Sequence, residues 1–205
     1  FNPFEVSIIR IDKSPSFQAR LDELNDQFLA DSYENHFITA SSYTFIYKEN
    51  KSFEEKDLLY FRGNAEFGGN LLRSFYRATG QEQDSLGSYE IFGIRFANYV
   101  KTHADLRFYR TFDDQRALAA RISGGIGVPL ENLSVLPFSK SFFGGGANGL
   151  RGWRARTLGP GSYFEPVLSY DRIGDMILEA NVEYRFNLVD YFDGAFFIDA
   201  GNIWL

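Results

Sequence analysis

The sequence predicts an all-β fold that is part of a transmembrane antiparallel up-and-down β-barrel. Three observations predict it: long segments of alternating polar and apolar residues, connections that alternate between long and short, and an aromatic-rich composition. The 205 residues include 22 Phe and 12 Tyr, which are types that favour strands. The sequence contains no run of about 18 apolar residues, so it predicts no transmembrane helix.

The clearest alternation runs through residues 95–109, where the charged side chains occupy odd positions and the even positions are uncharged. Similar alternation marks 116–128 and 177–188. Weaker alternation marks a further set of segments, namely 3–11, 38–48, 57–70 and 194–205. Most of these seven segments match or exceed the about 9–11 residues that cross a bilayer at a tilt. We therefore expect seven membrane-spanning strands.

The same alternation assigns the two faces of each expected strand, because successive side chains of a strand point in opposite directions. We expect the apolar set to face lipid: Val100, Leu106, Phe108, Ile122, Val182 and Phe186. We expect the charged set to face the barrel interior: Arg95, Lys101, Asp105, Arg107, Arg121 and Arg185.

The connections between the expected strands also alternate. The long ones cover 12–37, 71–94 and 129–176, and the short ones cover 49–56, 110–115 and 189–193. Outer-membrane barrels show this asymmetry, with long loops outside the cell and short turns in the periplasm. A helix is expected in the first long connection, after Ser14-Pro15-Ser16, and a second short helix is expected at 71–76.

Composition excludes several other kinds of site. The net charge of −6 argues against nucleic-acid binding, and the absence of cysteine excludes a disulfide scaffold, a thiol nucleophile and a thiolate metal site. His36 and His103 lie far apart in the sequence, which disfavours a zinc site. The glycine run 144–149 is not followed by Gly-Lys-Ser/Thr, and a Gly-x-Ser-x-Gly elbow is absent. We therefore expect no enzyme activity, no cofactor and no metal.

The longest connection carries the motif Phe-Phe-Gly-Gly-Gly-Ala-Asn-Gly-Leu-Arg-Gly-Trp at 142–153, followed by Leu-Gly-Pro-Gly at 158–161. This motif resembles the sixth extracellular loop of the BamA/TamA family of outer-membrane β-barrel assembly factors, whose Val/Leu-Arg-Gly-aromatic pattern is matched at 150–153. Two later segments, 182–184 and 197–204, resemble strand motifs of the family in the same order. The resemblance covers residues 95–205, and the loop is most similar to Bacteroidota members, including the TamA-like lipoprotein branch.

The resemblance implies a sixteen-stranded barrel of which this chain holds strands seven to thirteen. The other strands, the periplasmic POTRA domains and the lateral seam of the barrel would lie outside it. Residues 1–205 would then be part of one outer-membrane barrel domain, with 129–176 as a long inward-folding loop.

The resemblance also implies a function and a location. The protein would be integral to the outer membrane of a Gram-negative bacterium, where it would insert or translocate other polypeptides without ATP. Its partners would be outer-membrane lipid and lipopolysaccharide, unfolded outer-membrane client proteins and accessory assembly proteins. Two other functions stay open: a transport pore of the two-partner secretion type, which shares the loop motif, and an outer-membrane barrel with an enzymatic or ligand-binding role.

The candidate site joins this loop to the sheet. Asp199 lies among Phe and Ile residues, where a carboxylate needs a partner if it is buried. We expect Arg151 of the loop to contact Asp199 and Glu183, because the planar guanidinium can bind two carboxylates and stays charged when it is partly desolvated.

Four further residues belong to this loop-to-sheet motif. Leu150 precedes the arginine in the motif. Gly152 is expected to permit a tight turn, and Trp153 is expected to pack on the barrel wall beside the arginine. Gly201 is expected to leave room for a close approach on the strand that carries Asp199.

Overall fold

The structure is a computed structural model that describes residues 1–49, 57–84, 87–163, 171–189 and 191–205. Within these residues, seven strands form one sheet in the order β1-β2-β3-β6-β7-β8-β9, so strands consecutive in the sheet follow one another along the chain. The pairs β1–β2, β7–β8 and β8–β9 are antiparallel. The predicted all-β class and up-and-down order are confirmed.

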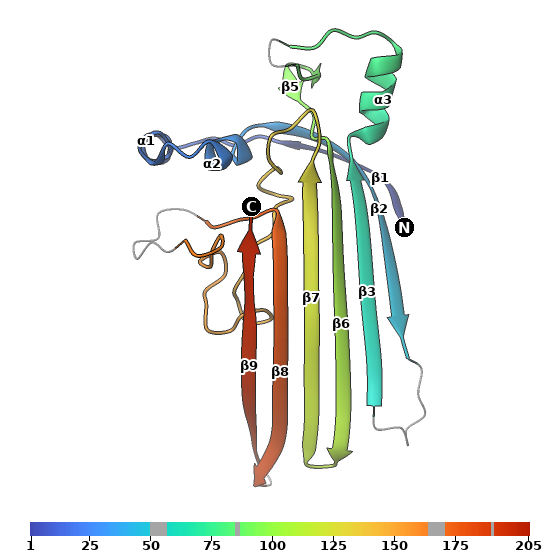
Figure 1. The fold of residues 1–205 in the computed structure, drawn as a ribbon, viewed down its shortest axis with the longest axis vertical. Coiled ribbons are helices and arrows are strands. Elements are labelled where there is room, and N and C mark those ends of the chain that lie inside the picture. Colours follow the sequence, from blue (N-terminus) through green and yellow to red (C-terminus); the bar gives the residue numbers. More distant parts are fainter. Residues whose placement is uncertain (50–56, 85–86, 164–170, 190) are drawn as a thin grey trace. The chain divides into compact units, whose positions relative to one another are not determined.

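The long strands and the helices have the following bounds: β1 (Asn2–Ile9), β2 (His36–Lys48), β3 (Asp57–Gly68), β6 (Tyr99–Asp113), β7 (Arg116–Pro129), β8 (Met176–Val189), β9 (Phe192–Trp204), α1 (Pro15–Leu24), α2 (Gln27–Ser32) and α3 (Asn70–Ala78). Figure 1 shows them along the chain. The connections alternate in length as the sequence predicts, and β6 and β7 are joined by two residues only. Among the described residues, no helix is long and apolar enough to cross a lipid bilayer.

The first long connection holds two helices instead of the one that the sequence predicts. Asn25 adopts a left-handed conformation (φ 48°) and ends α1, and the Asp26 side chain then accepts a hydrogen bond from the Leu29 N–H at the start of α2. The apolar spacing of Phe17, Leu21 and Phe28 continues across this break, which is why the pattern suggests a single helix.

The expected strand at 95–109 is displaced by four residues, because β6 begins at Tyr99 and ends at Asp113. Arg95 lies instead in the small hairpin β4 (Glu90–Ile91) and β5 (Ile94–Arg95), where it pairs with Asp84 at 3.2 Å. Positive φ angles at Phe92 and Gly93 form the tight turn of this hairpin. The prediction that Arg95 belongs to a membrane-spanning strand is therefore wrong.

The chain divides into two compact units. Unit 1 contains 1–43, 65–102 and 127–141, and unit 2 contains 44–64, 103–126 and 142–205. The hydrophobic core of unit 1 consists of Ile38, Ala40, Ala97, Tyr99 and Leu136. Leu136 belongs to the connection that follows β7, so the start of this connection completes the core of unit 1.

In unit 2, the register places unlike side chains on the two faces of the sheet. Glu183 of β8 lies opposite Ala119 of β7, whereas the preceding residue, Val182, lies opposite Ala120. The face that carries Glu183 is the polar face. The other, apolar face exposes large side chains, including Ile122 (52 % exposed), Val182 (47 %) and Ile198 (76 %).

Ala119 and Ala120 offer a matched test of the two faces, because they are identical, adjacent in β7 and point in opposite directions. If the apolar face contacts lipid, Ala120→Lys in the full-length protein should reduce the free energy of unfolding in lipid vesicles by about 2–4 kcal/mol. Ala119→Lys should cost much less, since its ammonium group would lie beside Glu183. Equal losses for the two variants would contradict the assignment of the faces.

Candidate functional site

The candidate site lies in unit 2, where part of the connection after β7 packs on the polar face of the sheet. The backbone of this connection is held by strand side chains. Asn181 Nδ2 donates to the Gly149 carbonyl oxygen at 2.8 Å, and Arg121 donates to the Asn148 carbonyl oxygen at 3.1 Å. The segment therefore docks through hydrogen bonds that only a polar strand face can offer.

Arg151 is the charged group by which this segment reaches the strands. Its guanidinium donates two hydrogen bonds to the Asp199 carboxylate of β9, both at 2.8 Å, and a further one to Glu183 of β8. Its backbone N–H also donates to Asp199 at 3.1 Å. The structure thus brings Arg151 together with both of the carboxylates that the sequence predicts as its partners.

The surroundings keep Arg151 charged and fixed. The Asp199 side chain is 7 % exposed and the Arg151 side chain 24 % exposed, so solvent screens the pair only in part. Hydrogen bonds to Asp199, and then those to Glu183, outweigh desolvation and raise the pKa of the Arg151 guanidinium above its usual value. The guanidinium also lies 3.7 Å from the ring centroid of Phe197, a cation–π arrangement.

The contacts of Arg151 continue into a larger set of paired charges on β6 to β9. Asn181 donates to Asp199 at 2.9 Å, and Arg185 pairs with Glu183 at 2.5 Å. Arg121 pairs with Asp105 at 2.7 Å and with Glu179 at 3.3 Å. We call the following residues the Arg151 network: Asp105, Arg107, Arg121, Arg151, Glu179, Asn181, Glu183, Arg185 and Asp199.

Charge in this network is balanced. Among the described residues it contains four arginines and four carboxylates, and Arg107 completes it by pairing with Asp105 at 2.6 Å. Removal of Arg151 would leave Asp199 without the arginine that compensates its charge in a partly desolvated site. The arrangement can hold a loop in place, and its carboxylates are all engaged by arginines.

The expectations for two glycines of this region, Gly152 and Gly201, are met only in part. Gly152 lies in a tight turn, in which the Trp153 N–H donates to the Leu150 carbonyl oxygen at 3.0 Å. The turn does not require a glycine there, because Gly152 has no positive φ and a Cβ would meet no heavy atom of the described chain within 4 Å. The left-handed glycines are Gly145 (φ 89°) and Gly146 (φ 96°), earlier in the same motif. At Gly201 a Cβ would meet the Leu178 carbonyl oxygen at 2.4 Å, so the close approach there is made by the neighbouring strand β8 and not by the loop.

The two hydrophobic residues of the motif closest to Arg151, Leu150 and Trp153, differ in how far they are buried. Leu150 is buried, at 4 % exposed. Trp153, which the motif places beside the arginine, is 43 % exposed, and its carbonyl oxygen accepts a hydrogen bond from the Gly146 N–H at 2.9 Å. The aromatic ring against the guanidinium is that of Phe197, because its strand position places it on the face that Arg151 contacts.

Unit 1 holds a second attachment of the same connection that the sequence does not predict. Lys140 pairs with Glu66 of β3 at 2.8 Å and with Glu5 of β1 at 3.4 Å, and its carbonyl oxygen accepts a hydrogen bond from Lys101 at 2.5 Å. Tyr99 donates to the same Glu66. A single lysine in a polar loop gives no specific signal, so only the structure reveals this contact.

Comparison with known proteins identifies the family. The model of the Omp85 superfamily domain matches residues 86–205, more than half of the chain. This chain belongs to the Omp85 superfamily. The expected BamA/TamA relationship is confirmed at this level, whereas the Bacteroidota and lipoprotein branches stay predictions.

This Omp85 chain is also similar to a curated bacterial protein. The outer membrane protein assembly factor BamA of Neisseria meningitidis serogroup B (strain ATCC BAA-335 / MC58) is 29 % identical over 120 residues, which cover 55 % of this chain and 15 % of that protein. The chain thus matches only a small part of the length of BamA. Every residue of the Arg151 network lies inside the Omp85 match at 86–205, whereas Glu5 and Glu66 of the second attachment lie outside it.

The Arg151 network predicts that one side chain controls how firmly the loop of this Omp85 protein is held. Arg151→Ala should lower the local stability of residues 144–151 by about 2 kcal/mol, since charged hydrogen bonds contribute about 1.5–3 kcal/mol. Hydrogen exchange of these amides in the full-length protein should accelerate by about 30-fold. Arg151→Lys should restore little of this protection, because an ammonium cannot bind Asp199 in the same two-pronged manner.

Arg154→Ala is the matched control, since Arg154 belongs to the same loop, carries the same charge and is exposed. It should leave the exchange rates of 144–151 unchanged. Equal acceleration in the two variants would show that Arg151 holds the loop no better than an exposed arginine does.

Proposed function

We propose that this Omp85 chain is part of the membrane-spanning barrel of an outer-membrane protein that inserts or translocates other polypeptides without ATP and without covalent chemistry. The observation that carries the proposal is the docking of the long loop, through Arg151, on one polar sheet face while the opposite face exposes apolar side chains. The relative BamA is named an outer membrane protein assembly factor, which supports the same function.

The apolar face of unit 2 is the first support for a membrane location. Leu178, Val182 and Ile198 are 49 %, 47 % and 76 % exposed, although their strands are long and regularly paired. Soluble proteins rarely expose contiguous apolar surfaces of this kind, whereas a barrel wall presents them to lipid. β8 and β9 contain 14 and 13 residues, enough to cross a bilayer at a tilt.

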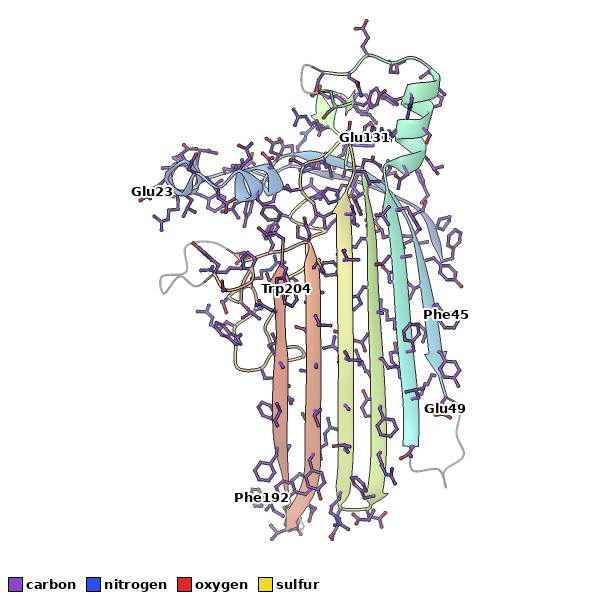
Figure 2. All side chains as sticks on the ribbon, in the orientation of Figure 1. Glu23, Phe45, Glu49, Glu131, Phe192 and Trp204 are labelled. Carbon is purple, nitrogen blue, oxygen red and sulfur yellow. The ribbon has the colours of Figure 1, made fainter. Side chains whose placement is uncertain are left out.

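Aromatic residues at both ends of β9 are the second support. Phe192 and Trp204, labelled in Figure 2, begin and end this strand. Near the Phe192 end, rings on β8 and β9 are in contact, with 6.0 Å between the centroids of Tyr184 and Phe186 and 5.2 Å between Phe186 and Phe196. Membrane barrels carry such aromatic girdles at the two levels where lipid meets water.

In the proposed barrel, residues 129–176 form the inward-folding loop, and the polar face lines the interior. The Arg151 network then fixes the loop against the inner wall at β8 and β9. A fixed loop stiffens the wall that a client polypeptide encounters. Assembly itself needs no chemical step, because unpaired strand edges are costly in lipid and readily template the pairing of another strand.

The proposed partners follow from this location. They are outer-membrane lipid, including lipopolysaccharide, unfolded outer-membrane client proteins and accessory assembly proteins. The apolar face would contact the lipid acyl chains, since these are the surroundings that its exposed side chains favour.

The test is client assembly in cells that depend on the full-length protein. We expect Arg151→Ala to reduce the amount of folded client barrel in the outer membrane several-fold, measured by resistance of the clients to proteolysis and to unfolding in detergent. The variant itself should reach the outer membrane in normal amount. Arg154→Ala should support normal client assembly, because its side chain lies outside the network.

The proposed role of the loop would be overturned if Arg151→Ala released residues 144–151 yet left client assembly unchanged. Recovery of the wild-type protein in the soluble fraction, instead of the outer membrane, would overturn the proposed location.

A further inference from the structure

Helix α3 of unit 1 exposes an apolar face that nothing in the proposed assembly function requires. Its inner side packs on the hairpin region, with the Tyr76 ring 5.6 Å from that of Tyr89 and 5.7 Å from that of Phe96. Leu71 and Phe75, one helical turn apart, lie on another side and are 78 % and 62 % exposed. The helix is therefore amphipathic, but its most apolar side chains point away from the core of the unit.

A groove lies at the start of this helix. It has a volume of about 760 Å³ and is lined by Phe4 of β1, Phe67 of β3, Val100 of β6, and Leu71 and Leu72 of α3. The β2 residues that line it are small: Thr39, Ala40 and Ser41. The volume falls in the range of pockets that hold ligands, and the lining is mostly apolar.

Two features indicate what occupies the groove. Phe4 and Phe67 are 67 % and 49 % exposed, and with Val100 they occupy apolar positions of their strands. The strands of unit 1 thus expose large apolar side chains of the kind that favour lipid. The polar side of α3 is basic: Arg73 pairs with Glu131, and Arg77 in the last turn is exposed. An interfacial helix has this arrangement, with apolar residues in the acyl layer and basic residues among lipid phosphates.

The connection that carries α3 determines which lipid is available. α3 belongs to the long connection between β3 and β6, and the proposed topology places long connections outside the cell. The lipid of the outer leaflet there is lipopolysaccharide, which carries several acyl chains beneath phosphate groups. We propose that the groove holds an acyl chain of lipopolysaccharide, with Arg77 facing the phosphates of the same molecule. This inference rests on the proposed membrane function.

Photo-crosslinking in the full-length protein tests the proposal. In one variant a benzophenone-bearing phenylalanine replaces Leu71. In a second variant it replaces Val182, on the apolar face of unit 2. Both of these side chains are exposed. The proteins are reconstituted in phospholipid vesicles with and without purified lipopolysaccharide. We expect position 71 to crosslink to lipopolysaccharide, and position 182 to crosslink to bilayer lipid in both kinds of vesicle.

A second change tests the groove itself. Ser41→Phe, which adds a large ring among its small residues, should reduce the lipopolysaccharide crosslink at position 71 several-fold. Ala200→Phe adds the same ring to the exposed side of β9 in unit 2 and should leave that crosslink unchanged.

The outcomes separate the two proposals. Crosslinking of lipid at position 182, without crosslinking of lipopolysaccharide at position 71, would overturn the groove assignment alone. A crosslink at position 71 that is equally strong with Ser41→Phe would also overturn it. Absence of any lipid crosslink at position 182 would overturn the membrane location on which the inference rests.

Discussion

The pairing of charges on the polar face of unit 2 is the constraint on which the rest of the site depends. Partly buried charges are tolerated only when ions of opposite sign and hydrogen bonds compensate them. Asp199 is 7 % exposed and lies on a strand rich in Phe and Ile, so it requires the cation that Arg151 supplies. The loop therefore supplies the charge that compensates Asp199 of the sheet, and the sheet supplies the contacts that hold the loop.

The sheet also provides the space into which the connection after β7 packs. In unit 2, a Cβ at Gly125 would meet the Phe142 ring at 2.5 Å. In unit 1, a Cβ at Gly127 would meet Leu136 at 2.3 Å. Both glycines belong to β7, so this strand lacks side chains at the places where residues of the following connection approach.

Alternation along the sequence is sufficient to predict most of the fold. A period of two residues reports directly which face of a strand a side chain occupies, and it places Glu183 and Asp199 on their strands. The prediction that Arg151 meets them comes instead from the loop motif and from the ability of a guanidinium to bind two carboxylates. The alternation misplaces the start of β6, because residues 95–98 alternate although they lie in and after the β4–β5 hairpin. The turn at Phe92-Gly93 depends on a positive φ at Phe92, which is uncommon for that residue type.

The rest of the site depends on contacts between distant segments. Lys140 meets Glu5 across 135 positions of the sequence, and no local pattern specifies such a pair. The roles expected for Gly152 and Trp153 follow from their residue types alone. The structure adds that the positive φ angles of the motif lie at Gly145 and Gly146 and that the ring against the guanidinium is that of Phe197.

The most direct test of the account is the coupling free energy between Arg151 and Asp199. A double-mutant cycle of Arg151→Ala and Asp199→Ala, measured as the stability of the docked loop in the full-length protein in lipid vesicles, isolates this interaction. The account predicts a coupling of about 1.5–3 kcal/mol. It also predicts no coupling in the parallel cycle of Arg154→Ala with Asp199→Ala. A coupling between Arg151 and Asp199 that cannot be distinguished from zero would contradict it.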